Sequence, residues 1–145
     1  LWGKVTLFDI GTKVPFLIRA PGLSKSGTIS EAMVELIDIY PTLADLVSLK
    51  APDHLQGSSL LPLLKYPDRM GKKKYAYSVV TRGSKLGYAL RNQNWRYGKW
   101  PDGEELYNLR SDPQEKNNLA EKEQVIEKLE EFRFALARKQ ENIVK

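Results

Sequence analysis

The chain has 145 residues and a mass of 16.6 kDa, and 41% of its residues are hydrophobic, which is enough for about one domain with its own core. It contains no cysteine, which excludes disulfides, thiolate metal sites and a cysteine nucleophile within this chain, and no apolar run approaches the roughly 18 residues of a membrane span. The net charge of +5 is uneven, because residues 65–99 hold ten basic residues and one acid. Such a local excess attracts anions, although a solvated surface or acids on an absent partner would explain it as simply.

The first twenty-two residues join a short polar block to an apolar run. Trp2 and Lys4 stand in the polar block, and residues 14–18 form a continuous apolar run between turn residues. This pattern predicts a strand buried on both faces in a mainly parallel sheet. The chain begins with neither an initiator methionine nor a leader, so we expect it to be a fragment of a larger fold.

Residues 30–49 have the periodicity of one long amphipathic helix, but Pro41 interrupts it. Proline lacks the N–H that a helix interior needs, so we expect a short strand or extended segment at 32–37, a helix N-cap at Asp38 and a helix over 39–49. Pro41 then lies in the first helical turn, where its missing donor costs nothing. The predicted apolar stripe of this helix consists of Tyr40, Leu43, Leu46 and Val47.

The segment that follows is a loop, a short apolar turn and a linker. The loop at 51–57 contains the only histidine, His54, which has no metal-site spacing around it and is expected to be a surface residue. Ser58 or Ser59 is predicted to cap a short turn at 60–64, and the polar segment 66–74 is the best candidate for a boundary between two layers.

The remainder of the chain predicts an antiparallel sheet covered by a helix. Strand-length segments at 75–82, 85–92, 95–100 and 105–109 are rich in aromatic and β-favouring residues and are separated by short turns. Helix signals run from 119 to 142, and the balanced charge of this region favours packing across the sheet over membrane or calmodulin binding. Its apolar stripe consists of Val125, Leu129, Phe132 and Leu136.

Three blocks, in this order, resemble the C-terminal third of a type I sulfatase, a member of the alkaline phosphatase-like superfamily. They are residues 3–9 (GKVTLFD) leading into 14–22, residues 37–46 (IDIYPTLADL) with 56–64 (QGSSLLPLL), and residues 105–120 (ELYNLRSDPQEKNNLA). Residues 75–97, with GYALR at 87–91 and WRY at 95–97, look closest to the iduronate-2-sulfatase branch.

The resemblance implies an α/β fold for the complete protein and an α+β arrangement for this fragment. Residues 1–65 would end the main α/β domain, 66–74 would be a linker, and 75–145 would form a C-terminal subdomain with a four-stranded antiparallel sheet and a long helix. The strand and helix signals, interpreted without the resemblance, predict the same sheet and helix for residues 75–145.

The resemblance also implies chemistry that this chain does not carry. Sulfatases of this kind use a formylglycine, made from the first residue of a Cys/Ser-x-Pro-Ser-Arg motif, and a calcium ion held by Asp, Asn or His. That motif is absent, since Ser111-Asp-Pro113 matches only its first and third positions, and the aspartates are too scattered to supply the oxygens that calcium prefers. We therefore expect the fragment to be inactive alone.

Lys4 is the residue to which the resemblance assigns a catalytic role. A lysine in this block contacts the sulfate ester in the family, and a compact ammonium suits an anionic group. Trp2 is expected to border the substrate and Arg91 to contact it, with Arg82, Arg96 and Lys99 as further candidates for holding an anionic saccharide. The structural alternative is that most of these cations only line the outer face of the sheet.

The leading hypothesis is that the complete protein hydrolyses sulfate monoesters of a sulfated saccharide. The partner of this chain would be the N-terminal portion of the same sulfatase. The alternatives are a stand-alone basic module that binds anions or glycans, and a phosphomonoesterase or phosphonate hydrolase of the same superfamily. Membrane association is not expected, and nucleic-acid binding is not favoured. The resemblance implies an exported, periplasmic or lysosomal location.

Overall fold

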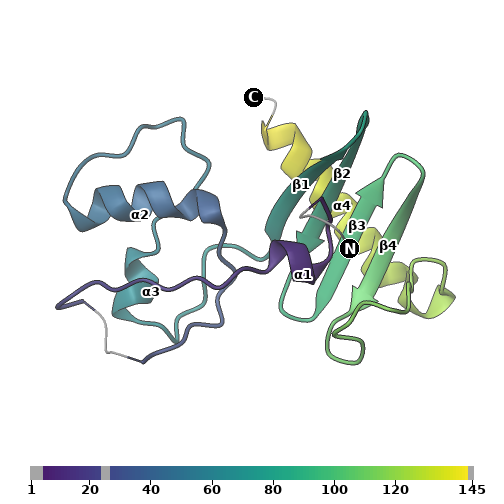
Figure 1. Cartoon of the computed structure of the whole chain (residues 1–145), viewed down its shortest axis with the longest axis horizontal. Helices are drawn as coiled ribbons and strands as arrows, with labels where there is room; N and C mark the ends of the chain where they lie inside the picture. Colours follow the sequence, from purple (N-terminus) through teal and green to yellow (C-terminus); the bar gives the residue numbers. More distant parts are fainter. Residues whose placement is uncertain (1–4, 24–26, 144–145) are drawn as a thin grey trace. The chain divides into compact units, whose positions relative to one another are not determined.

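The computed structural model describes residues 5–23 and 27–143, which divide into two compact units (Figure 1). One unit contains the described residues up to Val14 together with those from Tyr77 onward, and the other is Pro15–Ala76. The predicted assignment of residues 1–65 to a main α/β domain, with a linker at 66–74, concerns a longer protein and stays a prediction. None of the helices in the described chain has the length and apolar character that crossing a membrane requires.

The first unit is built on a four-stranded sheet with the order β1-β2-β3-β4. The strands are β1 (Ala76–Arg82), β2 (Lys85–Arg91), β3 (Trp95–Trp100) and β4 (Gly103–Asn108). β3 pairs antiparallel with both β2 and β4, so the predicted sheet is confirmed. β4 begins two residues before its expected start. The β1–β2 turn uses Gly83 at φ +59°, a conformation that glycine adopts without strain.

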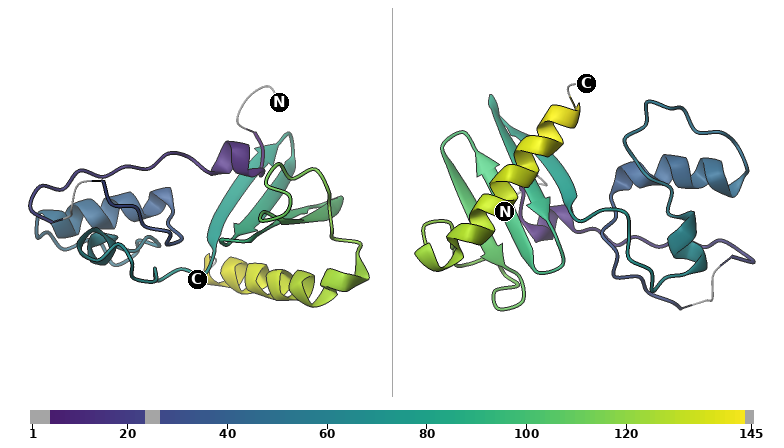
Figure 2. Two further views of the ribbon diagram at one scale, coloured as in Figure 1. Left: turned by 90° about the horizontal axis from the view of Figure 1, so that it is seen from below. Right: turned by 180° about the vertical axis from the view of Figure 1, so that it is seen from behind.

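Helix α4 (Ile126–Ile143) covers one face of this sheet, as Figure 2 shows. Its residues Leu129, Phe132 and Leu136 are buried against the sheet, and the centroid of the Phe132 ring lies 6.0 Å from that of the Tyr97 ring in β3. The predicted helix and these members of its stripe are confirmed, although α4 begins at Ile126 and not near residue 119. Val125 instead belongs to a short 3₁₀ helix, η2 (Glu123–Val125), which precedes α4.

The opposite face of the sheet is covered by the beginning of the described chain. Helix α1 (Asp9–Thr12) and the residues before it lie on the side of the sheet away from α4 (Figure 2). Thr6 and Leu7 are almost fully buried there, and the Phe8 ring lies 5.9 Å from that of Tyr107 in β4. The sheet is therefore enclosed between a long helix and a short segment that is distant in sequence.

In its described residues, 15–23 and 27–76, the second unit is made mainly of loops, with short helical elements and one isolated bridge. These are η1 (Leu36–Asp38), α2 (Ile39–Leu46), α3 (Leu61–Lys65) and the antiparallel bridge between Met33 and Lys73. The predicted short strand or extended segment at 32–37 forms this single bridge at Met33 and ends at Leu36, where the chain turns into η1. α2 carries Pro41 in its first turn, as expected, but ends before residue 49 because Ser48 adopts φ +58°.

The apolar segments that the sequence placed in a core are exposed in the second unit. Residues 14–18 form no strand, and Leu17 is 87% exposed. On α2 the buried residues are Pro41 and Thr42, whereas the predicted stripe residues Tyr40, Leu43 and Val47 are exposed. The predicted buried stripe of the helix is therefore wrong for this chain by itself, whereas the predicted strand belongs to the main sheet of a longer protein and stays a prediction.

Glu104 links α4 to the sheet, and its pKa is strongly lowered. Arg133 of α4 donates to both of its carboxylate oxygens, and the Tyr97 hydroxyl donates to Oε2 at 2.8 Å. Hydrogen bonding from Arg133 lowers the pKa of Glu104 from 4.5 to about 2, while burial raises the pKa of Tyr97.

We predict that Glu104→Gln destabilises the fold by about 1–2 kcal/mol at pH 7. Because the folded-state pKa lies below the unfolded one, this contribution is complete above pH 4.5 and is lost as the pH falls toward 2. Urea denaturation of both proteins between pH 7 and pH 2.5 measures it. Glu130→Gln, on the exposed side of Arg133, should cost less than about 0.5 kcal/mol. A pH-independent difference for Glu104→Gln would contradict the assignment.

Candidate functional site

The predicted catalytic residue Lys4 and its neighbour Trp2 lie outside the described residues. The description begins at Val5, the next residue along the chain, so the site can be built from the segment that follows Lys4 directly. We call residues 5–12 the N-terminal segment. Its contacts with the sheet decide how the predicted site block is held.

Arg96 of β3 is the centre of these contacts and is fully buried. Its guanidinium lies 4.5 Å from the centroid of the Phe8 ring and 4.8 Å from that of Tyr107. A buried arginine between two aromatic rings gains cation–π attraction that partly replaces its lost hydration. Gly98, two residues along β3, keeps the space open, because a Cβ there would approach Arg96 Nη1 to 2.8 Å.

Glu115 neutralises the buried guanidinium and also binds the N-terminal segment. Its Oε1 accepts a hydrogen bond from Arg96 Nε, and its Oε2 accepts one from the backbone N–H of Asp9 at 2.8 Å. Glu105 of β4 supplies a second carboxylate, at 3.1 Å from Arg96 Nη2. Among the described residues Arg96 Nη1 has no hydrogen-bond partner, so the two carboxylates and two rings carry nearly all of the compensation.

The turn that carries Glu115 is stabilised by Asp112. The Asp112 carboxylate accepts backbone hydrogen bonds from Asn117 at 2.8 Å and from Lys116 at 3.1 Å, which lower its pKa. Glu115 itself adopts φ +54°, a strained conformation for a residue with a side chain. The turn therefore accepts local strain and places the Glu115 carboxylate beside the Arg96 guanidinium.

Asp9 and Arg91 form a second attachment on the same face. Arg91 Nε lies 3.0 Å from Asp9 Oδ1 and 3.2 Å from Oδ2, and Nη2 lies 3.1 Å from Oδ2. Arg91 Nη1 donates to the carbonyl of Asn92 at 2.9 Å. The structure thus gives Arg91 an ion-pair partner that the sequence did not indicate, and its contact with a substrate stays a prediction.

Arg82 holds the beginning of the N-terminal segment. Its Nη2 donates to the carbonyl of Val5 at 3.2 Å, and its guanidinium lies 4.9 Å from the ring centroid of Trp100. Lys99 faces the other way, because its Nζ lies 3.9 Å from Glu104, beside α4. The four basic residues proposed for a saccharide therefore differ in their surroundings. Arg96 is buried and Arg91 is paired with Asp9, whereas Lys99 lies on the α4 side and Arg82 is exposed on the opposite face.

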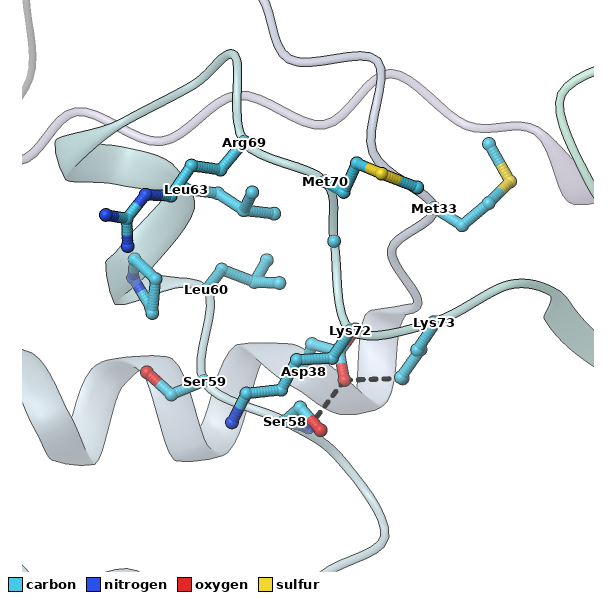
Figure 3. Close-up of a pocket in the computed structure, with 12 residues that line it drawn as sticks. Met33, Asp38, Ser58, Ser59, Leu60, Leu63, Arg69, Met70, Lys72 and Lys73 are labelled. Atoms are coloured by element: carbon cyan, nitrogen blue, oxygen red, sulfur yellow. Dashed lines mark hydrogen bonds and ion pairs between the residues drawn. The ribbon is translucent and has the colours of Figure 1, made fainter.

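The second unit contains a small cavity of about 130 Å³, drawn in Figure 3. At its edge the Asp38 carboxylate accepts hydrogen bonds from the backbone N–H of Ser58 at 2.7 Å and from Lys73 Nζ at 2.6 Å. Its other oxygen accepts from the backbone of Glu35, so the predicted N-cap uses its side chain to join three chain segments. Leu60 and Leu63 point toward the segment carrying Met70, and the cavity walls are mainly apolar.

The model of the family "N-sulphoglucosamine sulphohydrolase, C-terminal" matches residues 1–142 of this chain. The chain belongs to this sulfatase family. Arylsulfatase K of Gallus gallus is 34% identical over 130 residues, which is 81% of this chain and 24% of the relative. The ulvan-active sulfatase of Formosa agariphila is 30% identical, over 81% of this chain and 31% of its own length. The sulfatase chain thus spans about a quarter to a third of the curated relatives it matches.

Solved structures confirm an alkaline phosphatase-like fold and an α+β arrangement for this sulfatase chain. BT4656, in complex with its substrate D-glucosamine-2-N,6-O-disulfate, superposes with a TM-score of 0.78 at 27% identity, over 83% of this chain and 26% of that one. The phosphonate monoester hydrolase of Silicibacter pomeroyi superposes with a TM-score of 0.84 at 24% identity, over 97% and 31% of the two chains. The second likeness concerns the fold alone.

The residues of this sulfatase chain do not fit the formylglycine and calcium that its family implies. No cysteine occurs in the sequence, and no Ser-x-Pro-Ser-Arg segment replaces it. Within residues 5–23 and 27–143, no group of three or more His, Cys, Asp or Glu side chains is placed to hold a metal ion. The buried acids have other partners, since Glu115 binds Arg96 and Asp38 binds Lys73.

The pair of Arg96 and Glu115 yields a stability prediction. Replacing Arg96 by Met should cost about 3–5 kcal/mol of unfolding free energy, because it leaves Glu115 buried without its cation. The double variant Arg96→Met/Glu115→Leu should lose less than the sum of the two single variants. Urea denaturation of the chain measures all three proteins.

Lys128→Ala is the matched control for this experiment, because the ion pair of Lys128 in the described part of the chain is an i, i+3 pair with Glu131 on α4. It should change the stability by less than about 0.5 kcal/mol. A loss below 1 kcal/mol for Arg96→Met, or strict additivity in the double variant, would contradict the stabilising role of the ion pair between Arg96 and Glu115.

Proposed function

We propose that this chain is the C-terminal part of a sulfatase that hydrolyses sulfate monoesters of a sulfated saccharide. The observation that carries the proposal is the family match over residues 1–142. Sulfatase relatives support it, and so does the likeness to BT4656, whose structure contains a disulfated glucosamine. By family resemblance alone, the complete protein would be exported, periplasmic or lysosomal.

The catalytic machinery would be divided between this chain and the N-terminal portion of the same protein. Because the residues present here do not fit a formylglycine or a calcium site, we assign both to the N-terminal portion. This chain would then supply Lys4, while the fragment alone would be inactive. The attachment of the N-terminal segment to a rigid sheet supports such a role, since catalytic groups need fixed positions.

Lys4 would stabilise negative charge on the sulfate ester. Its ammonium is a compact cation with three donors, suited to sulfate oxygens or to the leaving oxygen. Trp2 would border the substrate. Arg91 would contact the saccharide with what donor capacity Asp9 leaves it, and its main contribution would be to hold Asp9 and therefore the segment next to Lys4.

The exposed apolar residues of the second unit support the N-terminal portion as partner. Leu17, Leu43 and Val47 are 87%, 57% and 64% exposed; Leu43 lies in α2, and Val47 follows its last residue directly. Apolar surface of this extent is normally covered in a finished fold. We propose that the main sheet domain of the complete sulfatase covers α2 and gives residues 14–18 their missing strand neighbours.

The position of the sulfate on the sugar is a finer proposal. The resemblance of residues 75–97 to iduronate-2-sulfatases favours a uronic acid 2-O-sulfate. BT1596, a 2-O GAG sulfatase, superposes with a TM-score of 0.63 at 30% identity, over 70% of this chain and 23% of that one. A panel of 2-O-, N- and 6-O-sulfated disaccharides would test this, together with matched phosphate esters for the phosphohydrolase alternative. Hydrolysis of the phosphate esters alone would contradict the sulfatase proposal.

We predict that Lys4→Ala lowers kcat/KM for sulfate-ester hydrolysis by the complete protein about 10²–10³-fold, because a charge-stabilising donor is lost from the transition state. Sulfate release from a sulfated disaccharide is the measurement. Lys13→Ala removes an exposed lysine nearby in the sequence and should leave turnover within twofold. Near-normal turnover of Lys4→Ala would remove Lys4 from the mechanism, and activity of the isolated chain would overturn the proposed division of the site.

We predict that Leu43→Glu affects the complete protein but not the isolated chain. Leu43 is 57% exposed in this chain, so the change should alter its unfolding free energy by less than about 0.5 kcal/mol. In the complete protein it would bury a charge and should cost at least about 3 kcal/mol. Thermal denaturation of both proteins decides this, with Asp45→Asn on the same helix as control. Equal tolerance in both proteins would show that α2 is not covered.

A further inference from the structure

The face of the sheet opposite α4 carries Arg82, whose charge is not neutralised by an ion pair among the described residues. Strand alternation and the pairing of Arg91 with Arg96 place Arg82, Arg91, Arg96 and Trp100 on this face. Arg91 binds Asp9, and Arg96 is buried against Glu115 and Glu105. Arg82 forms no ion pair among the described residues, and its side chain is exposed.

Arg82 also has hydrogen-bond donors to spare. A guanidinium carries five N–H donors, of which Nη2 uses one on the Val5 carbonyl, at 3.2 Å. The planar fork of arginine matches the oxygen spacing of a carboxylate or a sulfate, which it can bind through two parallel hydrogen bonds. The remaining donors are therefore suited to an oxyanion from solution.

Trp100 holds this guanidinium in one orientation. The indole lies across Gly87 of β2, where a Cβ would come within 2.6 Å of the ring, and the Arg82 guanidinium lies 4.9 Å from the ring centroid. Glycine at 87 is what allows the ring to lie flat on the sheet. Stacking on the ring and bonding to Val5 restrict the arginine before any ligand arrives, which lowers the entropy cost of binding.

The charges around Arg82 leave its positive charge uncompensated. Asp102 is an acid that Arg82 influences, and its carboxylate lies 2.6 Å from Lys85 Nζ. The pKa of Asp102 is lowered first by its hydrogen bond from Lys85, with the charge of Arg82 as a smaller contribution. Lys85 and Asp102 therefore neutralise each other and leave a net positive charge at Arg82.

We propose that Arg82, stacked on Trp100, forms a subsite for a second anionic group of the saccharide, a sulfate or a carboxylate other than the ester that is hydrolysed. The proposal rests on the function proposed above. Val5, which Arg82 binds, follows Lys4 directly in the chain, so the contact that Arg82 makes is one residue along the sequence from the lysine assigned to the scissile sulfate. The subsite selects substrates that carry two anionic groups.

The test compares Arg82→Ala with the parent complete protein on two substrates that share the scissile sulfate. One carries no other anionic group, and the second carries one further sulfate or carboxylate. The variant should raise KM for the dianionic substrate at least tenfold more than KM for the monoanionic substrate, and any change in kcat that follows from the lost hydrogen bond to Val5 should be the same for both substrates. Arg82→Lys should lie between, and Gly87→Ala, which displaces the indole, should resemble Arg82→Ala.

Arg138→Ala, which removes an exposed arginine on α4, is the control and should change neither substrate. An equal loss on both substrates would show that Arg82 acts only by holding Val5, and no loss would show that it is idle. Either result overturns the subsite. Separate sulfate and carboxylate versions of the second group identify which oxyanion it prefers.

The failure of the subsite can be distinguished from the failure of the proposed function. Calorimetric binding of the same two saccharides to the complete protein needs no turnover. If no sulfate ester is hydrolysed, the function proposed above fails, and a tenfold weaker binding of the dianionic saccharide by Arg82→Ala still supports the subsite. Equal binding by the parent and the variant overturns the subsite whether or not the protein is active.

Discussion

The buried ion pair between Arg96 and Glu115 is the interaction on which the first unit depends. Removing a guanidinium from water costs several kcal/mol, and here the cost is offset by two carboxylates and by the rings of Phe8 and Tyr107. The same carboxylate accepts the backbone N–H of Asp9. One charge pair therefore joins a central strand, the turn after β4 and the N-terminal segment, which are far apart in the sequence.

The two faces of the sheet consequently differ in chemistry. Beneath α4, Leu129, Phe132 and Leu136 make an apolar interface whose contribution is packing. The opposite face is held mainly by charged groups, and the segment it fixes is the one that the family resemblance associates with the sulfate ester. Directional contacts to Val5 and Asp9 define the position of a short segment more closely than apolar contact would, which suits a segment that must present a reactive side chain.

Much of the first unit follows from local signals. The strand segments, their short turns and the stripe of α4 have periods that neighbouring residues can satisfy, so sequence reasoning locates the strands to within two residues and finds the helix, although not its first residue. Residues 14–18 and the stripe on α2 are equally regular in sequence, yet Leu17 and Leu43 are exposed. An apolar pattern states that a residue needs a neighbour, but it does not state whether that neighbour belongs to the same chain segment.

The sequence by itself determined the family resemblance, the antiparallel sheet with its covering helix, and the candidate residue Lys4. Only the tertiary structure decided which cations are available to a ligand. Arg82, Arg91 and Arg96 are alike in sequence, but one is exposed, one binds Asp9 and one is buried against Glu115. These partners come from segments 19 to 82 residues away, and pairing over such separations depends on how the chain folds back over the sheet, which no local pattern specifies.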